Sequence, residues 1–182
     1  MTPQRARVEL RSPAPADRDE FLAAMRASRK LHRPWLQSPV TDEAYDELLV
    51  RVQDERYDPL FVCLRDGGAI VGYMNISQIV RGAFQNAFLG YGAVAAYAGQ
   101  GYMSEGLQLV LARAFTGLRL HRLEANIQPG NAASIALVHK AGFVREGFAE
   151  RYLKIGGRWR DHEHWVIRAE QWRARSRRPS RS

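Results

Sequence analysis

The stretch from Leu89 to Leu118 limits the possible folds more than any other part of the chain. A strand-like run breaks at Gly99-Gln100-Gly101 and continues as an amphipathic helix, with apolar residues at three- and four-residue spacing. Backbone N–H groups converge where a small-residue loop enters a helix, and the helix dipole favours negative charge there. Glycine also lets the backbone approach a ligand closely. The pattern therefore predicts an anion site, with a pyrophosphate as the favoured ligand.

Two common phosphate-binding motifs do not fit this loop. A P-loop needs Lys followed by Ser or Thr, and the chain contains neither pair. The dinucleotide-binding fingerprint needs a third glycine at position 104, where this chain has Ser104. From the bare pattern, an ordinary glycine-rich turn between a strand and a helix stays an alternative.

The sequence around the loop resembles the GNAT N-acetyltransferases. The segment Tyr97–Met103 is similar to their acetyl-CoA loop, and the likeness continues in order through Asn131–Ser134, Ala141–Phe143 and Tyr152–His162. Within that superfamily the chain resembles the RimJ/RimL branch, the ribosomal-protein-alanine N-acetyltransferases. The segment Val80–Phe84 brings it nearest to RimJ.

The resemblance covers about Val8 to Trp172 and departs from the loop motif at two positions. Ala98 stands where the motif has Arg or Gln, and Met103 replaces a small residue. Neither change removes a backbone N–H group. The loop is therefore expected to bind acetyl-CoA.

The order of the expected elements, together with the resemblance, predicts one α/β (α+β) domain with the GNAT fold, spanning residues 1–172. Its sheet would be mixed and mostly antiparallel, with six to seven strands and helices on both faces. A turn at Asp66-Gly67-Gly68 predicts a hairpin. A strand at Arg122–Ile127 should run parallel to Asn86–Val94, because a helix connects them. The next helix should be capped by Asn131 and end at Gly142.

Charge and composition limit the kinds of partner and compartment that the chain can have. The chain of 182 residues carries a formal charge of +8, and arginines crowd its last ten residues, 173–182. This segment is predicted to be a disordered, solvated tail, with weak RNA contact, for example with the ribosome, as the alternative. A single cysteine, Cys63, favours a reducing cytoplasm. No signal peptide or membrane span is expected, and both a monomer and a dimer stay open.

The resemblance implies a set of acetyl-CoA-binding residues. Backbone groups of Ala93 and Val94, at the end of the strand before the glycine loop, would hold the pantetheine arm and stabilise the oxyanion. Backbone groups of the glycine loop would hold the pyrophosphate. No metal is expected to take part: His162 and His164 lack a matching ligand cluster. The expected cofactor-binding residues are Ala93, Val94, Gly99, Gln100, Gly101, Tyr102, Met103, Asn131 and Ser134.

The proton-transfer residues are less conventional. Many GNAT enzymes carry a tyrosine acid seven residues after the Asn, where this chain has Val138. Ser134 matches a serine that lies near the CoA sulfur in the RimJ/RimL branch, although it could serve only the local backbone. The branch also has an acidic residue before the late Tyr-Leu pair, where this chain has Arg151. The neighbouring Glu150 and Tyr152 complete the catalytic candidates, although strand alternation would turn Glu150 to the opposite face.

Two residues are candidates for the acceptor site. Trp35 lies in a helix-breaking segment that corresponds to the acceptor loop of the family, although packing is its alternative role. Arg81 is included because the segment around it resembles RimJ.

The predicted site contains no strong general base, and this favours an α-amine as the acceptor. With a pKa near 8, about a tenth of a peptide α-amine is neutral at pH 7, whereas a lysine near 10.4 needs roughly 3 kcal/mol more help. The resemblance implies acetyl transfer to the N-terminal alanine of a ribosomal protein by direct attack in a ternary complex. The alternatives are a small amine or amino-acid-like acceptor, and a weakly catalytic CoA-binding or RNA-associated regulatory module.

Overall fold

Seven strands form one sheet in the order β1-β2-β3-β4-β5-β7-β6 in the computed structural model, which describes residues 6–176. All neighbours are antiparallel except β4 and β5, which run parallel as predicted. This confirms the mixed, mostly antiparallel sheet. The strands are β1 (Val8–Arg11), β2 (Asp58–Leu64), β3 (Ile70–Val80), β4 (Asn86–Ala93), β5 (Arg122–Ile127), β6 (Val144–Ile155) and β7 (Arg158–Arg168).

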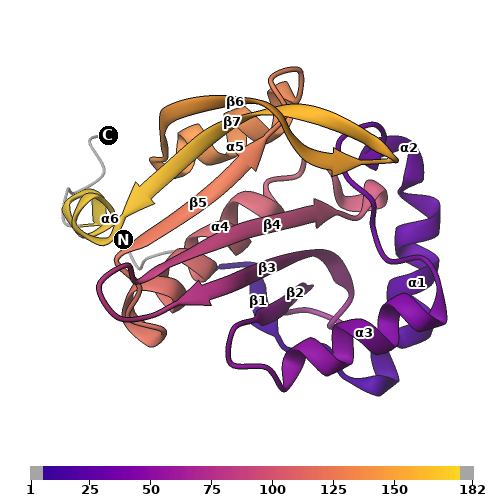
Figure 1. The fold of residues 1–182 in the computed structure, drawn as a ribbon. Helices are drawn as coiled ribbons and strands as arrows, with labels where there is room; N and C mark the ends of the chain where they lie inside the picture. Colours follow the sequence, from indigo (N-terminus) through magenta and orange to yellow (C-terminus); the bar gives the residue numbers. More distant parts are fainter. Residues whose placement is uncertain (1–5, 177–182) are drawn as a thin grey trace.

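Within residues 6–176, six α-helices connect or flank these strands (Figure 1). The first three lie between β1 and β2, the fourth connects β4 to β5, and the fifth connects β5 to β6. They are α1 (Arg18–Ala27), α2 (Arg29–His32), α3 (Asp42–Val52), α4 (Tyr102–Ala112), α5 (Ala132–Ala141) and α6 (Ala169–Ser176). None of the helices in residues 6–176 is both long and apolar enough to cross a membrane.

The C-terminal boundary differs from the expected one. The predicted tail begins at Arg173, but α6 runs through this position to Ser176. Arg175 Nη2 donates to the carbonyl of Lys140 at 3.2 Å, so the helix end is attached to α5. The rest of the expected tail, 177–182, lies outside the described residues.

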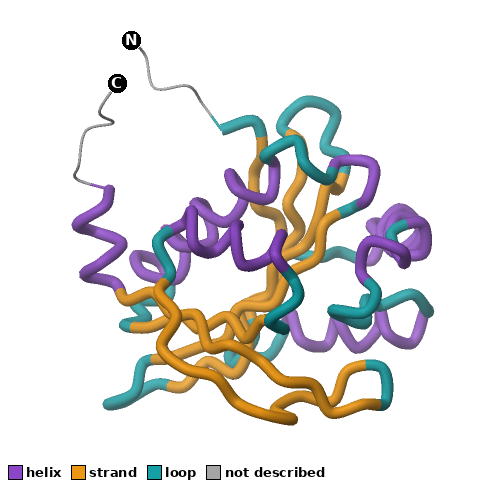
Figure 2. The backbone as a smooth tube through the Cα atoms, turned by 90° about the horizontal axis from the view of Figure 1, so that it is seen from above, coloured by secondary structure: helices purple, strands orange, loops and turns teal. Residues whose placement is uncertain are grey.

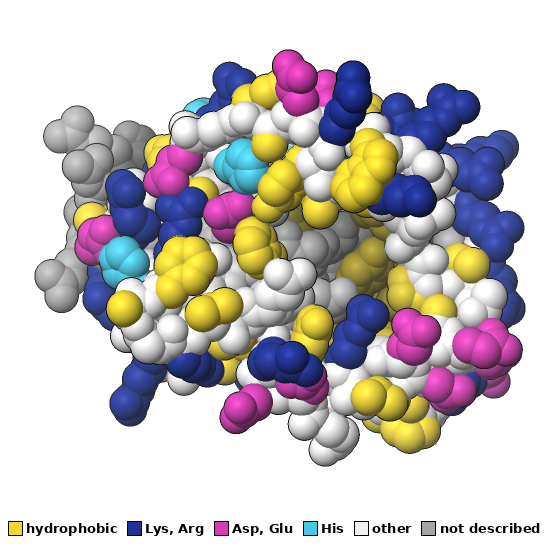
Figure 3. Space-filling model, in the orientation of Figure 1, with side chains coloured by type: hydrophobic (Ala, Val, Ile, Leu, Met, Phe, Trp, Pro, Cys, Tyr) yellow, Lys and Arg dark blue, Asp and Glu magenta, His cyan; other side chains and the backbone are white. Residues whose placement is uncertain are grey.

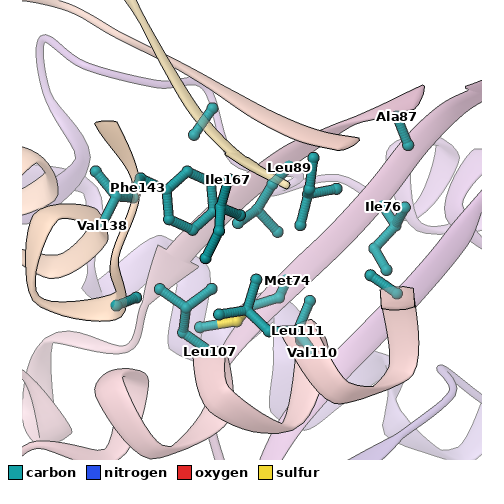
Figure 4. Packing of buried hydrophobic residues seen from close by; sticks show 14 of the residues in the cluster. Met74, Ile76, Ala87, Leu89, Leu107, Val110, Leu111, Val138, Phe143 and Ile167 are labelled. Carbon is teal, nitrogen blue, oxygen red and sulfur yellow. The ribbon is translucent and has the colours of Figure 1, made fainter. Parts of the chain in front are cut away.

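Two apolar clusters cover opposite faces of the sheet, because neighbouring residues of a strand point to opposite sides. On one face of the sheet, which we call the α4 face, Leu60 and Val62 pack with α4 and α5. Figure 4 shows Leu107, Leu111 and Val138 among the side chains of this cluster. On the other, the α1 face, Phe61 and Cys63 pack with α1 and α3. Figure 2 shows the helices in two groups with strands between them.

The parallel strands β4 and β5 stay paired for only three residues. Asn86, Ala87 and Phe88 face Arg122, Leu123 and Glu124, and beyond this point the two strands separate. From there β4 follows β3 as far as Ala93, whereas β5 follows β7 as far as Ile127. Figure 1 shows the two strands diverging toward the end where α2 lies. The sheet therefore opens at its centre.

Candidate active site

The glycine loop has the conformation that an anion site requires. Gly99 and Gly101 have φ of +76° and +87°, which residues with a Cβ rarely adopt, and Gly101 is the N-cap of α4. A Cβ on Gly99 would meet nothing within 4 Å, so the backbone there is open to a ligand. Gln100 lies between the two glycines, and the first turn of α4 begins at Tyr102. The backbone that the sequence indicated thus has a conformation suited to a pyrophosphate, and its role as the binding site stays a prediction.

An arginine that sequence reasoning missed lies against this loop. Arg7 Nη2 donates to the carbonyl of Gln100 at 2.9 Å, and its Nε donates to Glu105 at 2.7 Å. Its guanidinium also lies 4.4 Å from the centre of the Tyr102 ring. The contact joins residues 93 to 98 positions apart, so no local pattern signals it. Met103, by contrast, turns its side chain toward Gly72 and the core.

The open margin of β4 presents backbone groups to the gap between β4 and β5. The alternation of the ladder turns the N–H and C=O groups of Leu89, Tyr91 and Ala93 away from β3. Val94 behaves differently, because its N–H group donates to the carbonyl of Val71 at 2.9 Å. The Val94 N–H group is therefore already used within the sheet, and of the two residues predicted to bond the pantetheine, Ala93 is the one with its N–H group on the open margin.

A hydroxyl pair closes the gap on the α4 face. Asn131 caps α5 as predicted, its Oδ1 accepting from the Ser134 N–H group at 3.2 Å. Ser134 Oγ lies 2.5 Å from the hydroxyl of Tyr91, a residue of the open part of β4. Burial raises the pKa of Tyr91 to about 12, although its bond to Ser134 works against the shift. Ser134 therefore does more than serve the local backbone of the first helical turn, because its side chain faces β4.

On the α1 face, a carboxylate and an imidazole lie beside the point where the strands separate. His164 Nδ1 is 2.9 Å from Glu124 Oε1, and Glu124 belongs to the last pair that joins β4 to β5. Arg122 Nη2 donates to the other oxygen of Glu124 at 3.0 Å. The carboxylate favours a proton on Nδ1, which leaves Nε2 of His164 as a proton acceptor. Figure 3, drawn from this face, shows a hollow where β4 and β5 diverge.

Sequence reasoning missed Glu124 and considered His164 only as a metal ligand. Strand alternation places each on the α1 face, but the sequence does not say that β7 pairs with β5. Within residues 6–176, no three His, Cys, Asp or Glu side chains are grouped so as to hold a metal ion. The signal for the pair in the sequence was weak, because both strands, RLEANI and RWRDHEHWVIR, carry several other polar residues.

A bulge in β6 decides the positions of the other predicted catalytic residues. Three residues, Glu150 to Tyr152, lie opposite the single residue Asp161, and Arg151 has a φ of +48°. The bulge breaks the alternation that was used to orient Glu150. Tyr152 points to the α1 face, with its ring centre 4.8 Å from that of His164. Glu150 is exposed, and its side chain has no hydrogen bond or ion pair with any other described residue.

The two predicted acceptor residues lie at opposite ends of the sheet. Trp35 accepts a bond from Gln128 Nε2 at 2.9 Å through its carbonyl, and its ring lies against Gly130 near the end of β5. Arg81 follows Val80, which pairs with the first residue of β4. The eight-residue length of β4 then separates Arg81 from the open end by about 25 Å. Arg81 donates to the carbonyl of Leu118 instead, so the structure gives no support to its predicted role at the acceptor site.

A buried polar chain fixes the acceptor loop to the end of β4. His32 Nε2 lies 2.8 Å from the carbonyl of Ala93, and its Nδ1 lies 2.8 Å from Ser38 Oγ. Ser38 Oγ is in turn 3.3 Å from the hydroxyl of Tyr73. Because a carbonyl can only accept, Nε2 carries the proton and Nδ1 accepts from Ser38. Burial lowers the pKa of His32, which keeps the ring neutral.

Comparisons with known proteins agree with this geometry. The family model described as "Acetyltransferase (GNAT) domain" matches residues 7–144. The probable N-acetyltransferase YjcK of Bacillus subtilis (strain 168) is 45% identical over 98 residues, which are 54% of each chain. The [ribosomal protein uS5]-alanine N-acetyltransferase of Escherichia coli (strain K12) is 36% identical over 107 residues, 59% of this chain and 55% of the relative. The chain thus spans about half the length of the curated relatives it matches.

A solved structure extends the likeness over most of the fold. Mycobacterium smegmatis RimJ in complex with CoA-disulfide superposes with a TM-score of 0.81 at 29% identity. The match covers 90% of this chain and 82% of that one. The overall fold is therefore shared with a protein solved with a CoA compound.

Proposed function

Because the chain belongs to the GNAT acetyltransferase family, we propose that it transfers the acetyl group of acetyl-CoA to an amine, the α-amine of a protein N-terminus. The separation of β4 from β5 beyond Phe88 and Glu124 is the observation that carries this proposal. The gap gives a thioester access from the α4 face and an amine access from the α1 face. A direct attack can then take place across the sheet.

Acetyl-CoA is proposed to bind along the α4 face. The pyrophosphate would accept bonds from the N–H groups of the glycine loop, and the pantetheine arm would bond to the open margin of β4 at Ala93. The side chains of Tyr91 and Ser134 lie at the inner end of this path. Holding the thioester carbonyl in line with the attacking nitrogen supplies several kcal/mol of the rate enhancement, about 7 to 11 kcal/mol in the best cases.

The proton steps use groups on both faces. The neutral amine attacks the thioester carbon, the C–S bond of the tetrahedral intermediate then breaks, and the sulfur leaves as CoA thiolate. His164, oriented by Glu124, is proposed to take the proton that the nitrogen loses. Ser134 is proposed to hydrogen-bond the departing sulfur, with Tyr91 holding its hydroxyl in place. Tyr152 packs on His164, and Glu150 stays a more distant candidate for the base.

The acceptor that the relatives suggest is the N-terminal alanine of a ribosomal protein. The Escherichia coli relative is named for that reaction on uS5, and the superposed mycobacterial structure is a RimJ. An acceptor of this kind would be met in the cytoplasm. The second candidate class, a small amine or an amino-acid-like compound, is tested in the same assay.

The direct test is acetylation of defined acceptors. Purified protein and acetyl-CoA are incubated with peptides copying ribosomal-protein N-termini, with the same peptides carrying a formylated α-amine and an internal lysine, and with spermidine and free amino acids. Release of free CoA and intact mass are measured. Acetylation of the free α-amine alone is expected. Turnover of the formylated peptides or of the small amines instead would contradict the proposed acceptor.

A further inference from the structure

A cavity of about 580 Å³ adjoins the acceptor side of the gap. One wall is the chain from Arg29 to Val40, which includes α2 and the acceptor loop, and the other is the tip of the β6–β7 hairpin at Ile155 to Arg160. Figure 1 shows this hairpin tip beside α2. The cavity therefore lies between two segments that are far apart in the sequence.

Four arginines line the cavity, and no acidic residue does. They are Arg29, Arg33, Arg158 and Arg160. The remaining lining side chains are neutral or apolar. His32 counts among the neutral ones, because burial lowers its pKa. Figure 3 shows Lys and Arg side chains gathered on this side of the molecule. Because arginine keeps its proton at every physiological pH, the cavity is positively charged.

These four arginines also lack the partners that other arginines of the chain have. Arg11, Arg113 and Arg122 each form an ion pair with a nearby carboxylate. None of the four does so with any carboxylate in the described part of the chain. The Nε atom of Arg160 is buried and has no hydrogen-bond acceptor within residues 6–176. A desolvated guanidinium donor without an acceptor is unfavourable unless a ligand supplies one.

The cavity is connected to the reacting centre through the acceptor loop. His32, in the cavity wall, bonds to the carbonyl of Ala93 at the end of β4. Trp35, further along the loop, is bonded through Gln128 to the end of β5. The loop thus bridges the two strands where they are separated. An acceptor whose amine enters the gap would place its following residues, at about 3.3 Å each, toward the cavity.

We infer that this cavity selects acceptors with a carboxylate close to the amine, namely peptide N-termini with Asp or Glu among the second to fourth residues. The inference rests on the proposed function, because it concerns the acceptor side of the same site. Guanidinium groups match carboxylates in geometry and charge, and can bind them through two parallel bonds. The same charge disfavours polycations such as spermidine, and lysine side chains near the amine.

The test compares peptides of identical length that share an N-terminal alanine. One set carries Glu at positions two to four, one carries Gln, and one carries Lys, and kcat/KM is measured at two salt concentrations. The acidic set is expected to exceed the Gln set by at least tenfold, with a preference that shrinks as salt rises. Equal values for the three sets would overturn the inference and leave the proposed function standing. If no peptide of any set is acetylated, the proposed function itself fails.

A charge-reversed variant locates the preference. Arg160→Glu is expected to lower kcat/KM for the acidic peptides and to raise it for the lysine peptides, so that the ratio of the two changes by at least tenfold. Arg158→Gln should lower the ratio of kcat/KM for acidic peptides to that for lysine peptides by a smaller factor. It replaces Arg160→Glu as the test variant if that protein fails to fold. Arg119→Gln removes the same charge just before β5, at the far end of that strand from the cavity, and is the control. An unchanged ratio in a folded Arg160→Glu protein would overturn the inference.

Discussion

The hydroxyl of Tyr91 lies 2.5 Å from Oγ of Ser134, joining the open margin of β4 to the first turn of α5. If Ser134 stabilises the departing sulfur, the benefit arises mainly in the transition state. Ser134→Ala should then lower kcat by roughly ten- to a hundredfold, about 1.4 to 2.7 kcal/mol, with little change in acetyl-CoA affinity. Single-turnover rates and calorimetric titration with CoA measure the two quantities. A wild-type kcat would remove Ser134 from the mechanism.

Tyr91 provides a second, independent check on the same pair. Tyr91→Phe keeps the ring and removes only the hydroxyl, so it should lower kcat through a misplaced Ser134. The double variant should be little worse than Ser134→Ala alone, because the two groups act as a unit. Additive losses would show separate roles. A Val138→Tyr rescue is not expected, since Val138 is fully buried in the core and leaves no room for a ring.

The backbone of the glycine loop should be essential to CoA affinity. Gly101→Val places a β-branched residue at a φ of +87°, and its Cβ would lie 3.2 Å from Arg7. CoA binding should weaken at least tenfold by calorimetry. Gly67→Val is the matched control, because Gly67 has a φ of +79° in the remote β2–β3 turn. The control should lower the melting temperature but keep CoA affinity, and an equal loss of affinity in both would contradict the assignment.

The proposed base makes a prediction about pH. His164→Gln should lower kcat/KM by about a hundredfold or more near neutral pH, the usual scale for a lost general base. The loss should shrink at high pH, where hydroxide and a larger neutral fraction of the amine compensate. His121→Gln removes an exposed histidine whose side chain pairs with Glu170, and it should leave the whole profile unchanged. A constant loss at all pH values would indicate that His164 supports the structure and does not take the proton.

The buried state of His32 should make the fold sensitive to acid. Its pKa is lowered in the folded protein by burial, whereas the unfolded chain keeps the ordinary value of 6.5. As pH falls from about 7.5 to 5.5, the unfolded state takes up a proton that the folded state does not, so stability is lost. The buried His162 acts in the same direction.

Melting temperatures at the two pH values check this expectation. His32→Gln can still donate to Ala93 and accept from Ser38, and it cannot titrate. Its melting temperature should therefore fall less between pH 7.5 and 5.5 than that of the wild type, and His121→Gln should behave as the wild type does. An undiminished fall in His32→Gln would mean that other groups carry the acid sensitivity.

The elements of the fold could be predicted because each depends on neighbouring residues. Asn131 caps α5, Gly142 ends it with a φ of +103°, and Gly67 and Gly68 form the hairpin turn. The glycine loop was found for the same reason, since a strand, its turn and the helix start are continuous in the sequence. Local chemistry decides these features, so the sequence displays them.

The side chains of the site could not be predicted in the same way. Tyr91 and Ser134 are 43 residues apart, and Glu124 and His164 are 40 apart, so only the sheet order brings each pair together. The orientation of Glu150 could not be read from regular alternation, because a bulge interrupts β6. Arg81 was placed from the resemblance of its segment alone, and the length of β4 separates it from the open end of that strand.

The three residue pairs between β4 and β5 are also the only strand pairing, within residues 6–176, between a block of four strands and a block of three. The amide hydrogens of Leu89, Tyr91 and Ala93 along the open margin of β4 have no neighbouring strand to slow their exchange with solvent. A thioester arm seated there would take the place of the missing ladder. Binding of CoA would then slow the exchange of these amide hydrogens, and its release would restore the faster exchange.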